Sequence, residues 1–211
     1  MRPAVIIATV LVIFSFVMGF YLYPRMPVEL DSHWNAAGEA DGTSSKFSGL
    51  FAIPIVSLIL FLLLLFIPKI DPKKENIKKF QAYYDAMVLV MVVFFFYVYV
   101  LSIWWNLGWR FNFGTALLPA FTILFWFVGL LLEKAKMNWF VGIRTPWTLS
   151  SEKVWDKTHK VGARLFKIAA VMTLLGLVFR DQAILIVIVP AIVFAIYLVI
   201  YSYLVYKKEK H

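Results

Sequence analysis

The sequence predicts an all-α, polytopic membrane protein with six transmembrane helices. Hydrophobic residues make up 62% of the 211 residues, the mean hydropathy is +0.81, and only 16% of the residues are charged. A soluble domain carries about 25% charged residues. The second observation is that long apolar runs alternate with short polar connections, and the third is that basic residues gather in alternate connections. Six spans leave no room for a separate globular domain, so residues 1–211 are predicted to form one membrane domain.

Each apolar run is close to the roughly 20 residues that an α-helix needs to cross the hydrocarbon core. The runs are Ala4–Tyr23, Leu50–Ile67, Ala86–Trp105, Ala116–Leu132, Val161–Phe179 and Ala183–Tyr206. Pro119 falls in the first turn of the fourth run, where proline is tolerated. The first run is longer than a signal-peptide core, and no A-x-A-like site follows it, so we expect it to be retained as a span.

The basic residues predict the orientation. All but four of the 21 Lys and Arg residues lie at the two chain ends or in the second and fourth connections, the exceptions being Arg25, Lys46, Arg110 and Arg180. Connections rich in Lys and Arg stay in the cytoplasm. Both termini and the loop 133–162 are therefore predicted to be cytoplasmic, with the loop 24–49 outside. This distribution also explains the net charge of +9 without direct binding of nucleic acid.

The polar interval from Asn138 to Gly162 predicts a short turn followed by an amphipathic helix. Pro146 disfavours helix at the preceding residue, and Ser150 or Ser151 can cap a new helix. At helical spacing, one stripe is basic and consists of Lys153, Lys157, Lys160, Arg164 and Lys167. The opposite side is mixed and includes Trp155, Thr158, His159 and Gly162. Such a helix suits the cytoplasmic membrane interface, with lysines among anionic headgroups. An ordinary basic loop that only sets topology remains an equal alternative.

The sequence predicts no catalytic residues, no metal and no cofactor. There is no Cys, and His33 and His159 are expected on opposite sides of the membrane, where they cannot share a metal. Motifs for zinc proteases, serine hydrolases and P-loops are absent. Ionisable residues are confined to the ends of the spans, which argues against proton-coupled transport.

The outer loop and Arg144 have two interpretations each. The outer loop, with Asp41 beside His33, is either a site for a cation or cationic peptide or a set of turns in which Trp34 anchors to the interface. Arg144 either clamps an acidic partner or binds a lipid headgroup or the exposed carbonyl groups at the end of the fourth span. His159 is expected to be a buried hydrogen-bonding residue. By default, Trp139, Trp147 and Trp155 are expected to be interface anchors.

The residues 138–162 read N-x-x-x-G-I-R-T-P-W-T-L-S-S-x-x-x-W-x-x-T-H-x-x-G, which resembles the hallmark of the SdpI family of membrane proteins. Upstream, His33-Trp34-Asn35 with Gly38, Asp41, Gly42 and Lys46 resembles a loop of DUF1648, a domain of unknown function. The resemblance assigns residues 1–67 to the DUF1648-like part and residues 115–182 to the SdpI-motif part.

What the resemblance implies is an immunity or signalling protein of the cell membrane that binds its partners without catalysis. The implied partners are membrane lipids, a secreted toxin peptide and a transcriptional repressor at the cytoplasmic face. The outer partner-binding residues would be His33, Trp34, Asn35, Gly38, Asp41 and Lys46. The cytoplasmic ones would be Asn138, Gly142, Arg144, Thr145, Pro146, Trp147, Trp155, Thr158 and His159. A small transporter or channel-like protein is the alternative, with a membrane enzyme acting on lipid headgroups ranked below it.

Overall fold

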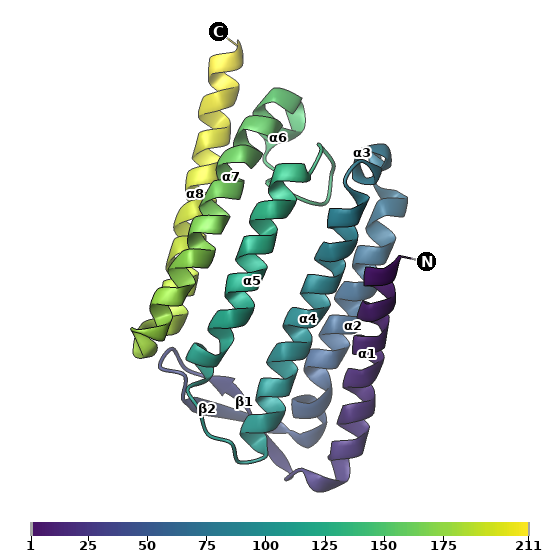
Figure 1. Ribbon diagram of the computed structural model, residues 1–211, viewed down its shortest axis with the longest axis vertical. Coiled ribbons are helices and arrows are strands. Elements are labelled where there is room, and N and C mark those ends of the chain that lie inside the picture. Colours follow the sequence, from purple (N-terminus) through teal and green to yellow (C-terminus); the bar gives the residue numbers. More distant parts are fainter. Residues whose placement is uncertain (1, 211) are drawn as a thin grey trace.

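The long helices of this chain stand side by side, in a computed structural model that describes residues 2–210 (Figure 1). The helices are α1 (Pro3–Leu22), α2 (Lys46–Ile70), α3 (Lys74–Lys78), α4 (Gln81–Asn106), α5 (Phe113–Lys134), α6 (Pro146–Ser150), α7 (Glu152–Thr173) and α8 (Ala183–Lys210). Short 3-10 turns follow α1 (η1, Tyr23–Arg25) and α7 (η2, Leu174–Leu177), and a third precedes α8 (η3, Arg180–Gln182).

The bundle consists of two groups of three helices. Helices α1, α2 and α4 pack on one another, and α5, α7 and α8 form the second group, with α4 and α5 joining the two. Both chain ends lie at one end of the bundle, together with α3 and α6 (Figure 1). This common end is called the terminal end below.

Five of the helices are long and apolar enough to cross a membrane, namely α1 with η1, α2, α4, α5 and α8 with η3. Large apolar side chains remain exposed along them, such as Ile123 on α5 and Ile196 on α8. Apolar surface of this extent is typical of a face that contacts lipid. The prediction of a membrane protein built from long apolar helices is therefore confirmed.

The predicted fifth span, Val161–Phe179, is not among these five helices. Residues 161–173 belong to α7, which begins at Glu152 and runs without a break along α5 and α8. The predicted surface helix and the predicted fifth span are thus one helix. Its basic first half lowers the mean hydropathy, while Ser151 caps it as predicted by accepting a hydrogen bond from the N–H of Val154 at 3.3 Å.

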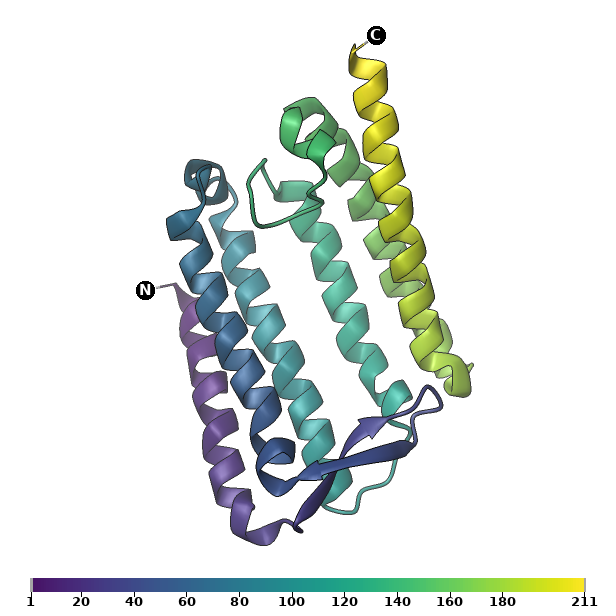
Figure 2. The ribbon, with the colours of Figure 1, turned by 180° about the vertical axis from the view of Figure 1, so that it is seen from behind.

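The opposite end of the bundle corrects the all-α prediction. Strands β1 (Glu29–Trp34) and β2 (Ala40–Ser45) form an antiparallel hairpin. This hairpin reaches under the bundle from the α1–α2 side towards α5 and α8 (Figure 2). Leu30 anchors it, since its side chain is 1% exposed and lies against Gly49 of α2. The sequence of β2 is mostly polar and small, so it carried no strand signal of its own.

Helix α5 begins earlier than predicted. Asn112 caps it by accepting a hydrogen bond from the N–H of Thr115 at 2.7 Å, and so Pro119 lies inside the helix and not in its first turn. The helix continues through Pro119, which lacks the N–H that would bond to the carbonyl group of Thr115 and whose ring crowds that carbonyl group.

Candidate functional site

The residues of the first motif form a hydrogen-bonded cluster at the terminal end of the bundle, between α5, α7 and α8. Asn138 holds the loop after α5 together, and its side chain is fully buried. Its Oδ1 accepts hydrogen bonds from the N–H groups of Phe140 (2.9 Å) and Val141 (2.7 Å). Its Nδ2 donates to the carbonyl oxygens of Lys136 (2.8 Å) and Val141 (2.9 Å). All the hydrogen-bonding capacity of the amide is used inside the loop, which makes Asn138 a structural residue.

His159 joins this loop to α7. Its Nδ1–H donates to the carbonyl oxygen of Trp155 at 2.9 Å, and its Nε2 accepts from the backbone N–H of Ile143 at 3.1 Å. The imidazole is 2% exposed and stacks on the Trp155 ring, with centroids 3.9 Å apart. Both nitrogens are engaged in the neutral form, so the prediction of a buried hydrogen-bonding histidine is confirmed.

The same surroundings hold His159 neutral. Burial lowers the pKa of the imidazole to about 4, and the hydrogen bond to the Trp155 carbonyl and the charge of Asp156 oppose this shift only in part. A proton on Nε2 would also have to displace the N–H of Ile143. The geometry therefore suits a fixed acceptor more than a group that exchanges protons near neutral pH.

Gly142 is required where the loop passes over this pair of rings. Its φ of +121° lies in the region that residues with a Cβ rarely adopt. A Cβ there would also collide with Nε2 of His159 and come within 3.1 Å of the Trp155 ring. The loop can therefore approach the rings only with glycine at this position.

A second, smaller hydrogen-bonded cluster surrounds α6. Thr145 and Thr148 form a capping box, with each side chain bonded to the other residue's backbone N–H. The hydroxyl groups of Thr145 and Ser202 lie 3.0 Å apart, which ties the loop to α8. Pro146 occupies the first helical position, and Trp147 packs on Tyr203 with ring centroids 5.1 Å apart.

The tryptophans of the motif do not behave alike. Trp155 is fully buried, and its Nε1–H donates to the carbonyl oxygen of Ala135 at 3.0 Å. Its prediction as an interface anchor was therefore wrong, because the side chain fills the core between α5 and α7. Trp147 is half-buried, and Trp139 is 48% exposed, so only these two retain surface that can meet lipid or a partner.

Arg144 is the exposed charged residue of the first cluster. Its Nη1 donates to the carbonyl oxygen of Trp139 at 2.8 Å. This carbonyl group belongs to the loop after α5 and not to the last turn of that helix, which ends at Lys134, so the contact differs from the helix-end interpretation. The remaining N–H groups of the exposed side chain stay accessible.

Helix α7 buries the predicted non-basic face. Thr158, His159 and Gly162 are buried, and Lys153, Lys157, Lys160 and Arg164 are exposed. The face opposite the lysines meets protein instead of lipid, which corrects the picture of a helix whose aromatic side enters the membrane. Lys167 pairs with Glu133 of α5 at 2.7 Å.

Two residues of the other helix group, which sequence reasoning missed, form hydrogen bonds to this cluster. Asp71, which ends α2, is 2% exposed, and its Oδ2 accepts from the N–H of Trp139 at 3.0 Å. Asn76 donates through Nδ2 to the carbonyl oxygen of Met137 at 2.8 Å. Both stand in a short charged connection that the sequence marks only as a loop. No pattern in the neighbouring sequence predicts their contacts with a loop more than 60 positions away.

The outer residues of the second motif lie on the hairpin. Asn35 shapes its turn, since Oδ1 accepts from the N–H groups of Ala37 (2.9 Å) and Glu39 (3.0 Å). Gly38 has a φ of +80°, and a Cβ there would lie 2.6 Å from Oδ1 of Asn112. These two residues therefore serve turn geometry, as one of the two interpretations predicted.

The other outer residues divide between packing and exposure. Trp34 stacks on Phe113 of α5 with centroids 3.7 Å apart, so it packs on protein and is not a lipid anchor. His33 is exposed with Nδ1 2.5 Å from Oδ1 of Asp41. Lys46 begins α2 with its Nζ over the Tyr23 ring.

Asp31 fixes the hairpin to α4 through several hydrogen bonds. Its Oδ2 accepts from Nε1 of Trp105 at 2.7 Å and from Nη1 of Arg110 at 3.2 Å. The amide of Asn106 bonds both the N–H and the carbonyl oxygen of Asp31. Beside Asp31 lies an open vestibule of about 1070 Å³, whose lining includes Glu39, Phe111 and Asp181.

The two motifs stand at opposite ends of the bundle, because the hairpin and the first turns of α7 are separated by the length of the helices (Figure 1). His33 and His159 are therefore kept apart, as predicted. Residues 2–210 contain no group of three or more His, Asp or Glu residues placed to hold a metal ion.

Comparison with known proteins agrees with both motifs. The SdpI/YfhL protein family matches residues 134–202, and DUF1648, a domain of unknown function, matches residues 10–58. The chain is 25% identical over 204 residues to Immunity protein SdpI of Bacillus subtilis (strain 168), covering 96% of each chain. No solved structure gives a significant match. With its long apolar helices, the chain is a multi-pass plasma membrane protein that is similar to the SdpI/YfhL protein family over residues 134–202.

Proposed function

We propose that this protein is a membrane immunity protein that protects its own cell by binding a secreted toxin peptide, without catalysis. The observation that carries the proposal is the similarity to Immunity protein SdpI along 96% of both chains. Because the match is continuous, both ends of the bundle have counterparts in that relative.

The proposal places the terminal end in the cytoplasm and gives the chain six crossings. Arg25, Lys46, Arg110 and Arg180 lie near the hairpin end, and the remaining basic residues lie at the terminal end. Residues rich in Lys and Arg stay on the cytoplasmic side. Helix α7 with η2 supplies the sixth crossing, because its residues from Ala169 to Leu177 are apolar except for the buried Thr173, and it lies along α5 and α8.

The outer vestibule is the surface that a secreted peptide would reach first. Trp105 and Phe111 give it an aromatic wall, and Asp31, Glu39 and Asp181 supply carboxylates. Arg110 neutralises only part of this negative charge, through its ion pair with Asp31. An aromatic wall with surplus carboxylates suits an amphipathic peptide that carries basic residues.

The terminal end carries a second binding surface, which suits a cytoplasmic regulator. Arg144 and the 48% exposed Trp139 lie together there, joined by the hydrogen bond from Nη1 to the Trp139 carbonyl oxygen. Exposed Trp and Arg are the residues most enriched at the energetic centres of protein interfaces. Binding, and not catalysis, is also supported at His159, because both its ring nitrogens are occupied within the fold.

The experiment is complementation of a Bacillus subtilis strain that lacks its own Immunity protein SdpI. This strain would carry the present chain and grow in mixed culture with its parent. We expect survival to rise with the number of copies of the protein, since each copy occupies about one peptide. Replacing Glu39 and Asp181 by Asn or Gln should reduce survival at equal membrane levels. Protection that does not depend on copy number would contradict a binding mechanism.

A further inference from the structure

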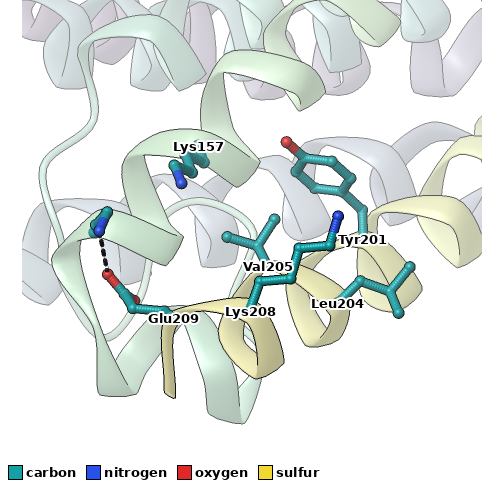
Figure 3. Close-up of a pocket in the computed structure, with 7 residues that line it drawn as sticks. Lys157, Tyr201, Leu204, Val205, Lys208 and Glu209 are labelled. Atoms are coloured by element: carbon teal, nitrogen blue, oxygen red, sulfur yellow. Dashed lines mark ion pairs between the residues drawn. The ribbon is translucent and has the colours of Figure 1, made fainter. Parts of the chain in front are cut away.

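We propose that a groove between the first turns of α7 and the last turns of α8 binds an anionic phospholipid, headgroup first. The groove has a volume of about 480 Å³. It is lined on α7 by Lys153 and Lys157, and on α8 by Tyr201, Leu204, Val205 and Lys208 (Figure 3). The proposal concerns lipid alone and does not depend on the proposed function.

The depth of the groove matches the boundary between hydrocarbon and headgroups. Helix α8 has 28 residues and is about 42 Å long at a rise of 1.5 Å per residue. The hydrocarbon core is about 30 Å thick, so a span that enters at Ala183 leaves near residue 203. Leu204 and Val205 then lie at the edge of the acyl chains, and Lys208 lies among the headgroups. Tyr203, which is 43% exposed, stands where interfacial tyrosines gather.

The polar wall of the groove is positively charged. Lys153, Lys157 and Lys208 face one carboxylate, that of Glu209. Glu209 already has partners at the edge of the groove, because Ser151 donates to its Oε2 at 2.7 Å. Its Oε1 lies 3.4 Å from Nζ of Lys153, and this ion pair is the dashed line in Figure 3. Among residues 2–210, neither Lys157 nor Lys208 forms an ion pair with a carboxylate. These two ammonium groups, one from each helix, are therefore available to a phosphate.

The groove has both a basic wall and an apolar floor, and the two together identify the ligand class. A soluble phosphate would use the lysines but not the apolar floor that Leu204 and Val205 provide. A phospholipid uses both, because its first acyl carbons cover the floor while its phosphate meets the lysines. The net positive charge favours a headgroup with a net negative charge, such as phosphatidylglycerol, over the zwitterionic phosphatidylcholine.

The test is native mass spectrometry of the full-length protein in neutral detergent, titrated with phosphatidylglycerol or phosphatidylcholine of identical chains. We expect phosphatidylglycerol to bind more tightly. Lys157→Gln with Lys208→Gln should weaken its binding roughly 25-fold, at about fivefold for each lysine near an anionic surface. Lys157→Arg with Lys208→Arg should keep the binding, and Glu209→Gln should tighten it because a competing carboxylate is removed.

The matched control is Lys74→Gln with Lys78→Gln, which removes the same charge from exposed positions on α3 at the same end of the bundle. Binding of phosphatidylglycerol should not change in this pair. The proposal is overturned if the control pair loses as much affinity as the groove pair, if phosphatidylcholine binds equally well, or if glycerol phosphate at the same concentration displaces the lipid. If the Gln pair does not fold, the Arg pair and Glu209→Gln still decide, since unchanged affinity in Glu209→Gln contradicts a charge-selective groove.

Discussion

The Nε2 atom of His159 accepts a hydrogen bond from the backbone N–H of Ile143 at 3.1 Å, across 16 positions of the chain. This bond joins the loop after α5 to the first turns of α7. It forms only because Gly142 lets the backbone pass close to the Trp155 and His159 rings. Four separate positions of the sequence motif, Gly142, Ile143, Trp155 and His159, thus describe one contact between a loop and a helix.

The first prediction concerns acid stability. The pKa of His159 is about 4 in the folded protein against an ordinary value of 6.5, because burial disfavours the charged ring. Between these two values the unfolded chain binds a proton that the folded chain does not, so stability falls as the pH drops from about 6.5 to about 4. At about 1.4 kcal/mol per pKa unit, the full effect is about 3 kcal/mol.

Chemical unfolding in detergent, followed by tryptophan fluorescence at several pH values, measures this slope. His159→Gln is the control, since a residue that cannot titrate removes the difference in proton binding. The same slope in the wild type and in His159→Gln would show that other groups cause the acid sensitivity.

The second prediction compares two glycines with positive φ. Gly142 (φ +121°) faces the His159 and Trp155 rings, whereas Gly108 (φ +99°) has no atom within 4 Å of where a Cβ would lie. Gly108→Ala should cost only the backbone strain of about 1–2 kcal/mol. Gly142→Ala should cost more than this, because the ring pair must move and the hydrogen bond to Ile143 is lost. Thermal unfolding of the two variants in the same detergent gives the comparison, and equal costs would contradict a close approach at Gly142.

The third prediction separates binding from catalysis. His159→Gln keeps a hydrogen-bonding group but loses the stacking on Trp155, and we expect about 1–2 kcal/mol of lost stability. Protection per molecule that reaches the membrane should be nearly unchanged, because the ring serves the fold. A general base, in contrast, would lose about 10²–10⁴-fold in rate. Survival in mixed culture, normalised to the amount of protein in the membrane, distinguishes the two outcomes.

The fourth prediction concerns the orientation. Reporter fusions at Thr43 and Asn112 should report the outside, and fusions at Asn76, Ser151 and after Lys210 should report the cytoplasm. The reason is the excess of Lys and Arg at the terminal end. A cytoplasmic signal at Thr43 would place the hairpin on the wrong side for a secreted peptide. An outside signal after Lys210, with Ser151 in the cytoplasm, would remove the sixth crossing by α7.

Much of the fold was predictable because long apolar runs leave few alternatives in a membrane. Every backbone N–H and C=O must be satisfied within the segment, so an apolar run such as 183–206 becomes a helix. The cap at Ser151, the extended backbone at Thr145 and the two faces of α7 also follow from local rules. The hairpin did not, since the polar strand β2 is held by its pairing with β1 and by the contacts of Asp31 with α4.

The sequence by itself determined the class of protein, the helices and the positions of both motifs, because hydropathy, charge and turn residues act over a few neighbouring positions. The tertiary structure decided what those motif residues do. Trp155 is a core residue and not a membrane anchor because the loop after α5 covers it. Asp71 matters because it meets Trp139 across 68 positions of the chain. Lys157 and Lys208 form one groove because α7 and α8 run side by side. Contacts between distant segments depend on how the helices pack, and no local pattern records that packing.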